Sequence, residues 1–263
     1  MIVKSSLYHL GLSCFPISIM ALINIFYSFY FEYLENINSY LSTLILSLIS
    51  GLLLYYLGKK KSQGISIYEQ LILIFFIYLL IPFFLLIPFY FSSYDISFID
   101  SYFESISGFT GTGFSIFKNI ENLDSPLILW RSSSQWIGGF YFLIFLVLVF
   151  SNKQINFKMI DLTFNLEKKI DFSSNLLSVT NRIFLIYFSL SVLIFFLFLI
   201  SGIRIFDSLN MAMSISSSGG FLPTNSLNDI IRNNFQSIVL CLSFLLLILN
   251  FYFLYNLLIE RDN

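Results

Sequence analysis

The most restrictive feature of this sequence is an internal repeat. Its two copies are FESISGFTGTGF at residues 103–114 and NMAMSISSSGGF at residues 210–221. When Ser107 is aligned with Ser214, an upstream aspartate and the final Gly-Phe also coincide, at a constant offset of 107 residues. Each copy lies between long apolar stretches. Short polar loops of this kind, present twice, indicate a membrane protein that forms an ion-binding constriction from backbone oxygens.

Composition supports the membrane class. The chain is 57% hydrophobic and 11% charged, with a mean hydropathy of +0.83, whereas a soluble domain carries roughly 25% charged residues. The net charge of −1 gives no reason to expect a nucleic-acid partner. One histidine and two cysteines, both cysteines in apolar segments, argue against a disulfide, a metal site or a bound cofactor. A membrane enzyme would need clustered acids or histidines, so we do not expect an enzyme.

Six apolar segments are long enough to cross a bilayer, which needs about 20 residues per helix. Pro82 and Pro88 predict a kink in the third. The six predicted spans are residues 10–31, 40–57, 70–91, 126–150, 182–201 and 235–258.

The distribution of basic residues predicts the orientation. Lysines cluster at 59–61 and between 153 and 169, and ten of the 14 basic residues fall on one side when both termini are cytoplasmic. This is the positive-inside pattern of a multi-pass protein, here in the cytoplasmic (inner) membrane of a bacterium. Both repeat loops then face outward.

Within each repeat a short helix is expected before the polar loop. Residues 97–108 and 205–215 would form helices of about 18 Å or less, too short to span. The first loop (residues 109–114) and the second loop (residues 216–221) follow them. Irregular backbone at membrane depth is tolerated only inside protein or beside water, so both loops are predicted to be re-entrant. Carbonyls of Thr110, Gly111, Thr112 and Gly113 could then replace part of a cation's water shell.

Glu104 and Arg131, which lie near the repeat loops in sequence, each have alternative predicted roles. Glu104 could face the ion path or bond to adjacent loops. Arg131 could tune the outer vestibule or pair with an acid on the loop, or it could anchor the interface with Trp130. Gly138 and Gly139 are expected to permit close helix packing.

Three segments resemble the Trk/Ktr potassium-transport superfamily, in its N-terminal half only. They are FESISGFTGTGF, LWRSSSQWIGGF at residues 129–140, and DSLNMAMSISSSGGF at residues 207–221. The resemblance implies a potassium permeation protein, with potassium as transported substrate and a cytoplasmic nucleotide-binding regulatory subunit beneath it. The family's filter glycines map onto Gly113 and Gly220, and its filter backbone maps onto residues 109–113 and 216–220. That mapping adds four candidate ion-binding residues to the first-loop set: Ser217, Ser218, Gly219 and Gly220.

The resemblance fixes the expected organisation. The predicted fold is an all-α membrane protein with six transmembrane helices and two re-entrant pore helix–loop units, half of a four-repeat channel-like fold. The predicted segments are 1–66 (N-terminal helix pair), 67–152 (first helix–pore loop–helix unit), 153–181 (cytoplasmic linker) and 182–263 (second unit).

Two loops cannot close a four-sided filter, so a second half is expected as a partner. It could be a separately encoded chain or a second copy. Two alternatives stay open: a truncated remnant or assembly subunit without transport, and a sodium-permeable member of the family.

Overall fold

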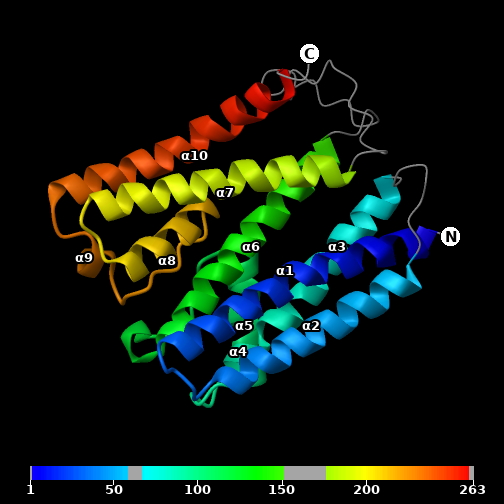
Figure 1. Cartoon of the computed structure of the whole chain (residues 1–263), viewed down its shortest axis with the longest axis horizontal. Helices are drawn as coiled ribbons and strands as arrows, with labels where there is room; N and C mark the ends of the chain where they lie inside the picture. The colour runs from blue at the N-terminus through cyan, green and yellow to red at the C-terminus, as the bar shows by residue number, and fades with distance from the viewer. Residues whose placement is uncertain (1, 59–66, 151–175, 261–263) are drawn as a thin grey trace.

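The computed structural model describes residues 2–58, 67–150 and 176–260, and within these ranges the regular structure is helical. Part of the predicted linker 153–181 lies outside them. Figure 1 shows the helices in chain order. They are α1 (Ile2–Tyr30), α2 (Ile37–Leu57), α3 (Ile67–Leu85), α4 (Ile87–Tyr90), α5 (Phe98–Thr110), the 3₁₀ turn η1 (Ile120–Asn122), α6 (Ser125–Phe150), α7 (Leu176–Ile200), α8 (Ile205–Ser216), α9 (Leu227–Ile230) and α10 (Asn234–Glu260).

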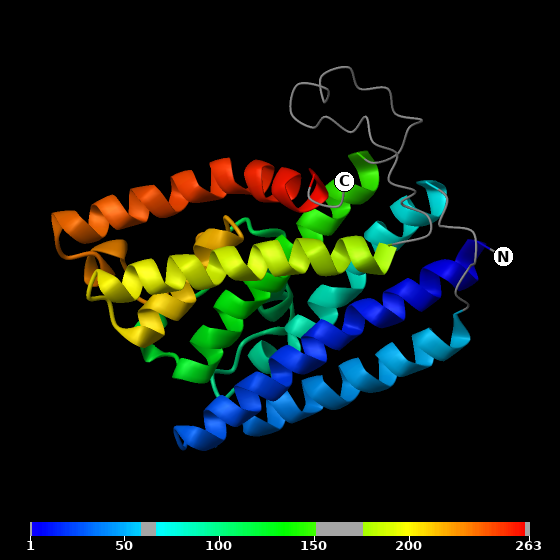
Figure 2. The same cartoon turned by 45° about the horizontal axis from the view of Figure 1, so that its top comes forward.

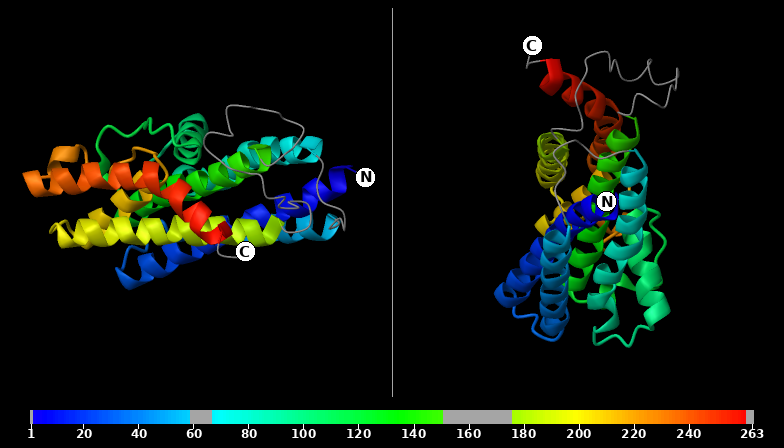
Figure 3. Two further views of the ribbon diagram at one scale, coloured as in Figure 1. Left: turned by 90° about the horizontal axis from the view of Figure 1, so that it is seen from above. Right: turned by 90° about the vertical axis from the view of Figure 1, so that its right-hand side faces the viewer.

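In the left view of Figure 3 the long helices lie along the longest dimension of the molecule, and Figure 1 shows α1, α2, α3 and α6 inclined to α7 and α10. Four stretches are long and apolar enough to cross a membrane: Ser6–Tyr30, Ile37–Leu57, Tyr68–Tyr90 and Thr180–Ile200. They confirm, on length and composition, four of the six predicted spans. Helices of 26 and 27 residues, α6 and α10, occupy the other two positions. The polar run RSSSQ at residues 131–135 lowers the hydropathy of α6.

The third apolar segment is interrupted, as its prolines predict. Helix α3 ends at Leu85 and α4 begins at Ile87, with Pro82 on one side of the break and Pro88 on the other. A proline lacks the N–H that continues the helical ladder, so the interruption falls here.

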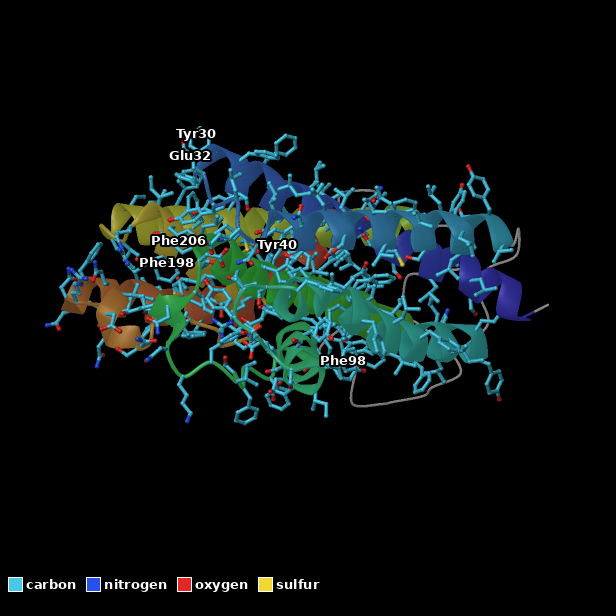
Figure 4. All side chains as sticks on the ribbon, turned by 90° about the horizontal axis from the view of Figure 1, so that it is seen from below. Tyr30, Glu32, Tyr40, Phe98, Phe198 and Phe206 are labelled. Atoms are coloured by element: carbon cyan, nitrogen blue, oxygen red, sulfur yellow. The ribbon has the colours of Figure 1, made fainter. Side chains whose placement is uncertain are left out.

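Two short helices, α5 and α8, precede the repeat loops at the predicted positions. Ser97 caps α5, since its hydroxyl accepts a hydrogen bond from the Asp100 N–H at 3.1 Å. In Figure 4, α5 is seen nearly end-on while the long helices lie across the picture, so α5 runs across them. Phe98, at its start, lies at the outer edge of the molecule.

The described helices pack around two large hydrophobic clusters, and a smaller third cluster of Phe140, Ile183 and Tyr187 joins α6 to α7. One large cluster joins α1, α2, α3, α5 and α6, and includes the fully buried Tyr40 (Figure 4). The other large cluster joins α7, α8 and α10 around Phe198 and Met211. Helix α6 contacts α1, α3, α4, α5, α7 and α8, and Figure 2 shows it passing between the two groups. Both repeat loops are therefore built against the same helix.

The start of α6 is fixed by a polar cluster outside the predicted spans. The Asp124 carboxylate accepts a hydrogen bond from Asn36 Nδ2 at 2.9 Å, and the Asp124 N–H donates to the Tyr94 hydroxyl at 2.6 Å. Burial raises the pKa of the Asp124 carboxyl above its usual value, although the Asn36 bond opposes this shift. This cluster ties the α1–α2 pair to α6, the helix against which both loops pack.

Candidate functional site

The two repeat loops lie side by side, backbone against backbone. A Cβ atom added to Gly111 would lie 3.5 Å from Ser217 O and 3.8 Å from Gly219 Cα. One added to Gly113 would overlap Gly219 O, and one added to Gly220 would lie 4.0 Å from Gly113 Cα. Segments 107 residues apart in sequence are thus brought into contact through their glycines.

The loops also share an unusual backbone conformation. Gly111 and Ser218, equivalent in the repeat, have φ of +69° and +55°. Gly113 and Gly220, also equivalent, have φ of +76° and +81°. Positive φ is unfavourable for residues with a Cβ, which explains glycine at three of the four positions and implies local strain at Ser218.

The same hydrogen bonds end both short helices. Thr112 N–H bonds to Ser107 O at 3.1 Å, and Gly111 N–H bonds to Gly108 O at 3.0 Å. This pair of bonds is a Schellman motif with the left-handed residue just past the helix end. The second loop repeats both bonds at the same offset, each at 2.8 Å: Gly219 N–H to Ser214 O, and Ser218 N–H to Ile215 O.

Hydroxyl groups at equivalent positions repeat the pattern. Thr110 Oγ1 donates to the carbonyl four residues earlier at 2.8 Å, and Ser217 Oγ does the same at 2.9 Å. In the first loop, Thr112 Oγ1 also donates to Ser107 Oγ at 3.1 Å. These local bonds hold each loop in shape without using other elements.

Seven of the eight predicted ion-binding residues are exposed or half-buried. Thr110, Thr112, Ser218 and Gly220 are exposed, whereas Gly219 is buried. The remaining three, Gly111, Gly113 and Ser217, are half-buried.

Gln135 on α6 holds the second loop from behind. Its Nε2 donates to Gly219 O at 2.7 Å, and its Oε1 accepts from the Phe221 N–H at 3.1 Å. Gln135 is itself fully buried, so it satisfies two backbone groups that have lost water. The predicted ligand Gly219 O is therefore already engaged by a protein donor. Gln135 was not among the predicted site residues.

Arg131, one turn before Gln135, forms a buried ion pair with the first short helix. Its Nε lies 2.8 Å from Glu104 Oε1, and the two side chains are 1% and 0% exposed. Glu104 Oε2 also accepts the Ile116 N–H at 2.9 Å, and Ser115 Oγ donates to Glu104 Oε1 at 3.0 Å. Glu104 thus bonds to an adjacent loop, the second of its two readings.

Arg131 reaches the second loop as well. Its Nη1 donates to Leu222 O at 3.3 Å, and its guanidinium carbon lies 4.3 Å from the centre of the Phe221 ring. The reading of Arg131 as an interfacial anchor with Trp130 is wrong, because both side chains are buried and Trp130 Nε1 donates to Leu85 O at 3.0 Å. Arg131 does pair with an acid, but that acid, Glu104, lies on helix α5 and not on the loop, where it was predicted.

Two glycines one turn further along α6 allow both short helices to approach. A Cβ on Gly138 would overlap the backbone of Phe109, and one on Gly139 would lie 2.7 Å from both Ser217 Cβ and Tyr187 Oη. The prediction of close packing at these glycines is confirmed. One face of α6, carrying residues 131, 135, 138 and 139, therefore contacts both loop regions.

A family model described as TrkH, a cation transport protein, matches residues 36–263. The chain belongs to this TrkH family. The expected resemblance to Trk-type transport proteins is thereby confirmed, and the protein is a membrane protein of a cation transport family.

The individual relatives have low sequence identity to this chain. The chain is 28% identical over 192 residues to an uncharacterized cation transporter of Methanocaldococcus jannaschii, covering 72% of this chain and 40% of that protein. It is 26% identical to the Trk system potassium uptake protein TrkI of Halomonas elongata, covering 50% of this chain and 27% of the relative. The crystal structure of the potassium transporter TrkH from Vibrio parahaemolyticus matches with a TM-score of 0.76 at 19% identity, over 92% of this chain and 49% of that one. The chain therefore spans half or less of the TrkH-family proteins it matches.

Proposed function

We propose that this chain forms half of a potassium-uptake pore in the cytoplasmic membrane. The observation that carries the proposal is the pair of adjacent loops with matching positive φ at 111 and 218 and at 113 and 220. Two loops of similar backbone conformation that meet at one place favour a shared ion path. An inside-negative potential assists each entering monovalent cation by about 2.3 kcal/mol per 100 mV.

In this proposal the loops are re-entrant and their main-chain oxygens replace part of the ion's hydration shell. The ligands are drawn from Thr110, Gly111, Thr112 and Gly113 in the first loop and from Ser217, Ser218, Gly219 and Gly220 in the second. Gly219 O differs from the others because it is held by Gln135. We assign Gly219 mainly to keeping the loop in place.

The proposed arrangement has six spans and both termini in the cytoplasm. Residues 1–66 form the accessory helix pair, and residues 67–152 and 182–263 form the two helix–pore loop–helix units. Residues 153–181 form a cytoplasmic linker suited to a nucleotide-binding regulatory subunit. Names of the curated relatives are those of transporters, which supports a transport role over an enzymatic one.

A four-sided filter needs two further loop units. Residues 1–263 correspond to about half of the solved TrkH chain, since the match covers 49% of that chain, so the further loop units would come from outside these residues. A separately encoded chain or a second copy could supply the other half. The remnant and sodium-permeable alternatives predict different outcomes when a potassium-uptake-deficient strain is tested for rescue.

The experiment is rescue of a potassium-uptake-deficient strain at low potassium by this chain together with its completing half. We expect growth and rubidium uptake to be restored. Gly113→Ala is expected to abolish uptake or relax its potassium preference. Gly202→Ala is the matched control: Gly202 also has a positive φ, +86°, but has nothing within 4 Å of an added Cβ.

Each alternative has its own outcome. A sodium-permeable protein would carry sodium at least as well as rubidium through the wild-type complex. A non-transporting remnant would reach the membrane and fail to rescue with every completing half. Equal uptake by the Gly113→Ala and Gly202→Ala variants would contradict a filter at Gly113.

A further inference from the structure

Two equivalent phenylalanines occupy opposite environments. Phe114 ends the first loop and Phe221 ends the second, at the same offset of 107 residues. Phe221 is 2% exposed, whereas Phe114 is 71% exposed. Because the two loops share their backbone conformation, local structure does not explain this difference. What differs is the helix that covers the ring.

Phe221 is covered by α6, which comes from the preceding helix–loop–helix segment. The Arg131 guanidinium lies over the Phe221 ring at 4.3 Å, and Gln135 bonds both to the Phe221 N–H and to Gly219 O. Arg131 also donates to Leu222 O at 3.3 Å. Positions four residues apart lie on one face of a helix, so a cation and an amide with this spacing reach one loop edge together.

The first loop has the same backbone groups and the same phenylalanine ring, but no helix equivalent to α6 covers them. Repeat equivalence assigns Thr112 O to the role of Gly219 O, the Phe114 N–H to that of Phe221, and Ser115 O to that of Leu222 O. Among the side chains that the structure describes, those of residues 6–58, 68–146 and 180–247, none bonds to Thr112 O or the Phe114 N–H, and no aromatic or cationic group is stacked on the Phe114 ring. The Thr112–Phe114 edge of the first loop is therefore uncovered, whereas the equivalent edge of the second loop forms an interface with α6.

We propose that the Thr112–Phe114 edge binds a helix from outside residues 1–263 that carries an arginine and, four residues later, a glutamine or asparagine. The arginine stacks on the Phe114 ring and donates to Ser115 O, and the amide bonds to Thr112 O and the Phe114 N–H. A planar guanidinium suits both roles better than an ammonium. This inference rests on the proposed function, in which further units complete the pore.

A second copy of this chain fits the edge poorly. In a twofold pair the helix preceding the first loop would be α10 of the other copy, and residues 234–247 of α10 contain no charged side chain. Arg232 and Gln236 have the right spacing but are already engaged within their own segment. Gln236 accepts from the Arg232 N–H at 2.7 Å and donates to Ser201 O at 3.2 Å, and Arg232 Nε donates to Asp229 O at 3.1 Å.

The test replaces Phe114 with the photo-crosslinking residue p-benzoylphenylalanine in the full chain, in membranes of the cell that naturally makes it. Irradiated products are digested and the linked peptide is sequenced by mass spectrometry. The matched control is the same replacement at Phe221, which we expect to link to α6 of the same chain. If that buried position does not tolerate the larger ring, the half-buried Leu222 replaces it as the control. A second exposed position, Ile99 in the first turn of α5 at 78% exposed, serves as the control outside the proposed edge and is expected to give no adduct with that helix.

The proposal predicts an adduct at Phe114 on an apolar helix outside residues 1–263 that contains the arginine and the amide four residues apart. Changing that arginine to leucine should cause loss of the adduct. An adduct on α10 of a second copy, on a helix without the pair, or on lipid alone would overturn the proposal. Cross-linking does not depend on transport, so the predicted adduct without rescue of potassium uptake would refute only the proposed function. Rescue with an adduct on a second copy would refute only this inference.

Discussion

The two loops have the same internal structure but different surroundings. Each ends a short helix with a Schellman motif, a hydroxyl bonded to the carbonyl four residues earlier, and two residues of positive φ. The second loop is held from behind by Gln135, whereas the first leaves Phe114 uncovered. The comparison shows that local sequence sets the shape of each loop, while the neighbouring helix sets its position.

The short helices differ in polarity as well. Glu104 on α5 is paired with Arg131, whereas its equivalent on α8 is Met211, which is buried among apolar side chains. A buried ion pair costs desolvation energy, and its value lies in fixing specific partners. Here the pair connects α5, α6 and the segments that follow both loops. The first unit therefore supplies the polar contacts that hold the second.

The largest effect is expected from separating this ion pair. Arg131→Leu leaves a buried, unpaired Glu104 and should cost about 3–5 kcal/mol of stability. Adding Glu104→Met, which copies Met211 of the second unit, should restore much of the loss. The midpoint of thermal unfolding in detergent measures both. If the double variant is no more stable than the single one, the pair is not the source of the effect.

Next in size is the change Gly138→Ala. The new Cβ would overlap the Phe109 backbone, which cannot move without displacing α5, so we expect a loss of about 3 kcal/mol. Gly51→Ala is the control, because its Cβ would lie 3.1 Å from Cys14 Cβ and 3.2 Å from Gly11 O, which are wider contacts on α1 and leave α5 untouched. Equal unfolding midpoints for the two variants would contradict the close approach of α5 to α6.

Gln135→Leu should affect the second loop alone. It removes the partners of Gly219 O and the Phe221 N–H, and should cost about 2 kcal/mol. We expect a cysteine at Ser217 to react faster with a water-soluble maleimide, and one at Thr110 to react at the wild-type rate. Both reporters are measured in a Cys14→Ser, Cys241→Ser background. Equal acceleration at both positions would mean that Gln135 supports the fold generally.

The smallest effect comes from exchanging the left-handed residues. Ser218→Gly removes the strain of a positive φ and should stabilise the protein by about 0.5–1 kcal/mol, whereas Gly111→Ser should destabilise it by a similar amount. The two unfolding midpoints should therefore move in opposite directions. Shifts of the same sign would show that the two loops do not share a backbone conformation.

Much of this architecture follows from the sequence because it is local. The repeat located α5 and α8, and Pro82 and Pro88 located the break between α3 and α4. Three of the four positive φ positions in the loops carry glycine, but Ser218 does not, and Gly219 has no positive φ. Which helix lies behind which loop depends on tertiary packing. Arg131 and Glu104 are 27 residues apart, so their pairing was one of several possibilities. Gln135 was missed, although an arginine, a glutamine and two glycines along one face of an apolar helix are a usable signal.

The decisive measurement is the position of a heavy monovalent cation in a structure of the completed complex. Thallium or rubidium can be located by anomalous scattering. We predict a peak between residues 110–113 and 217–220, near main-chain oxygens of both loops. Loops separated from each other, or a cation path that passes elsewhere in the complex, would contradict the account.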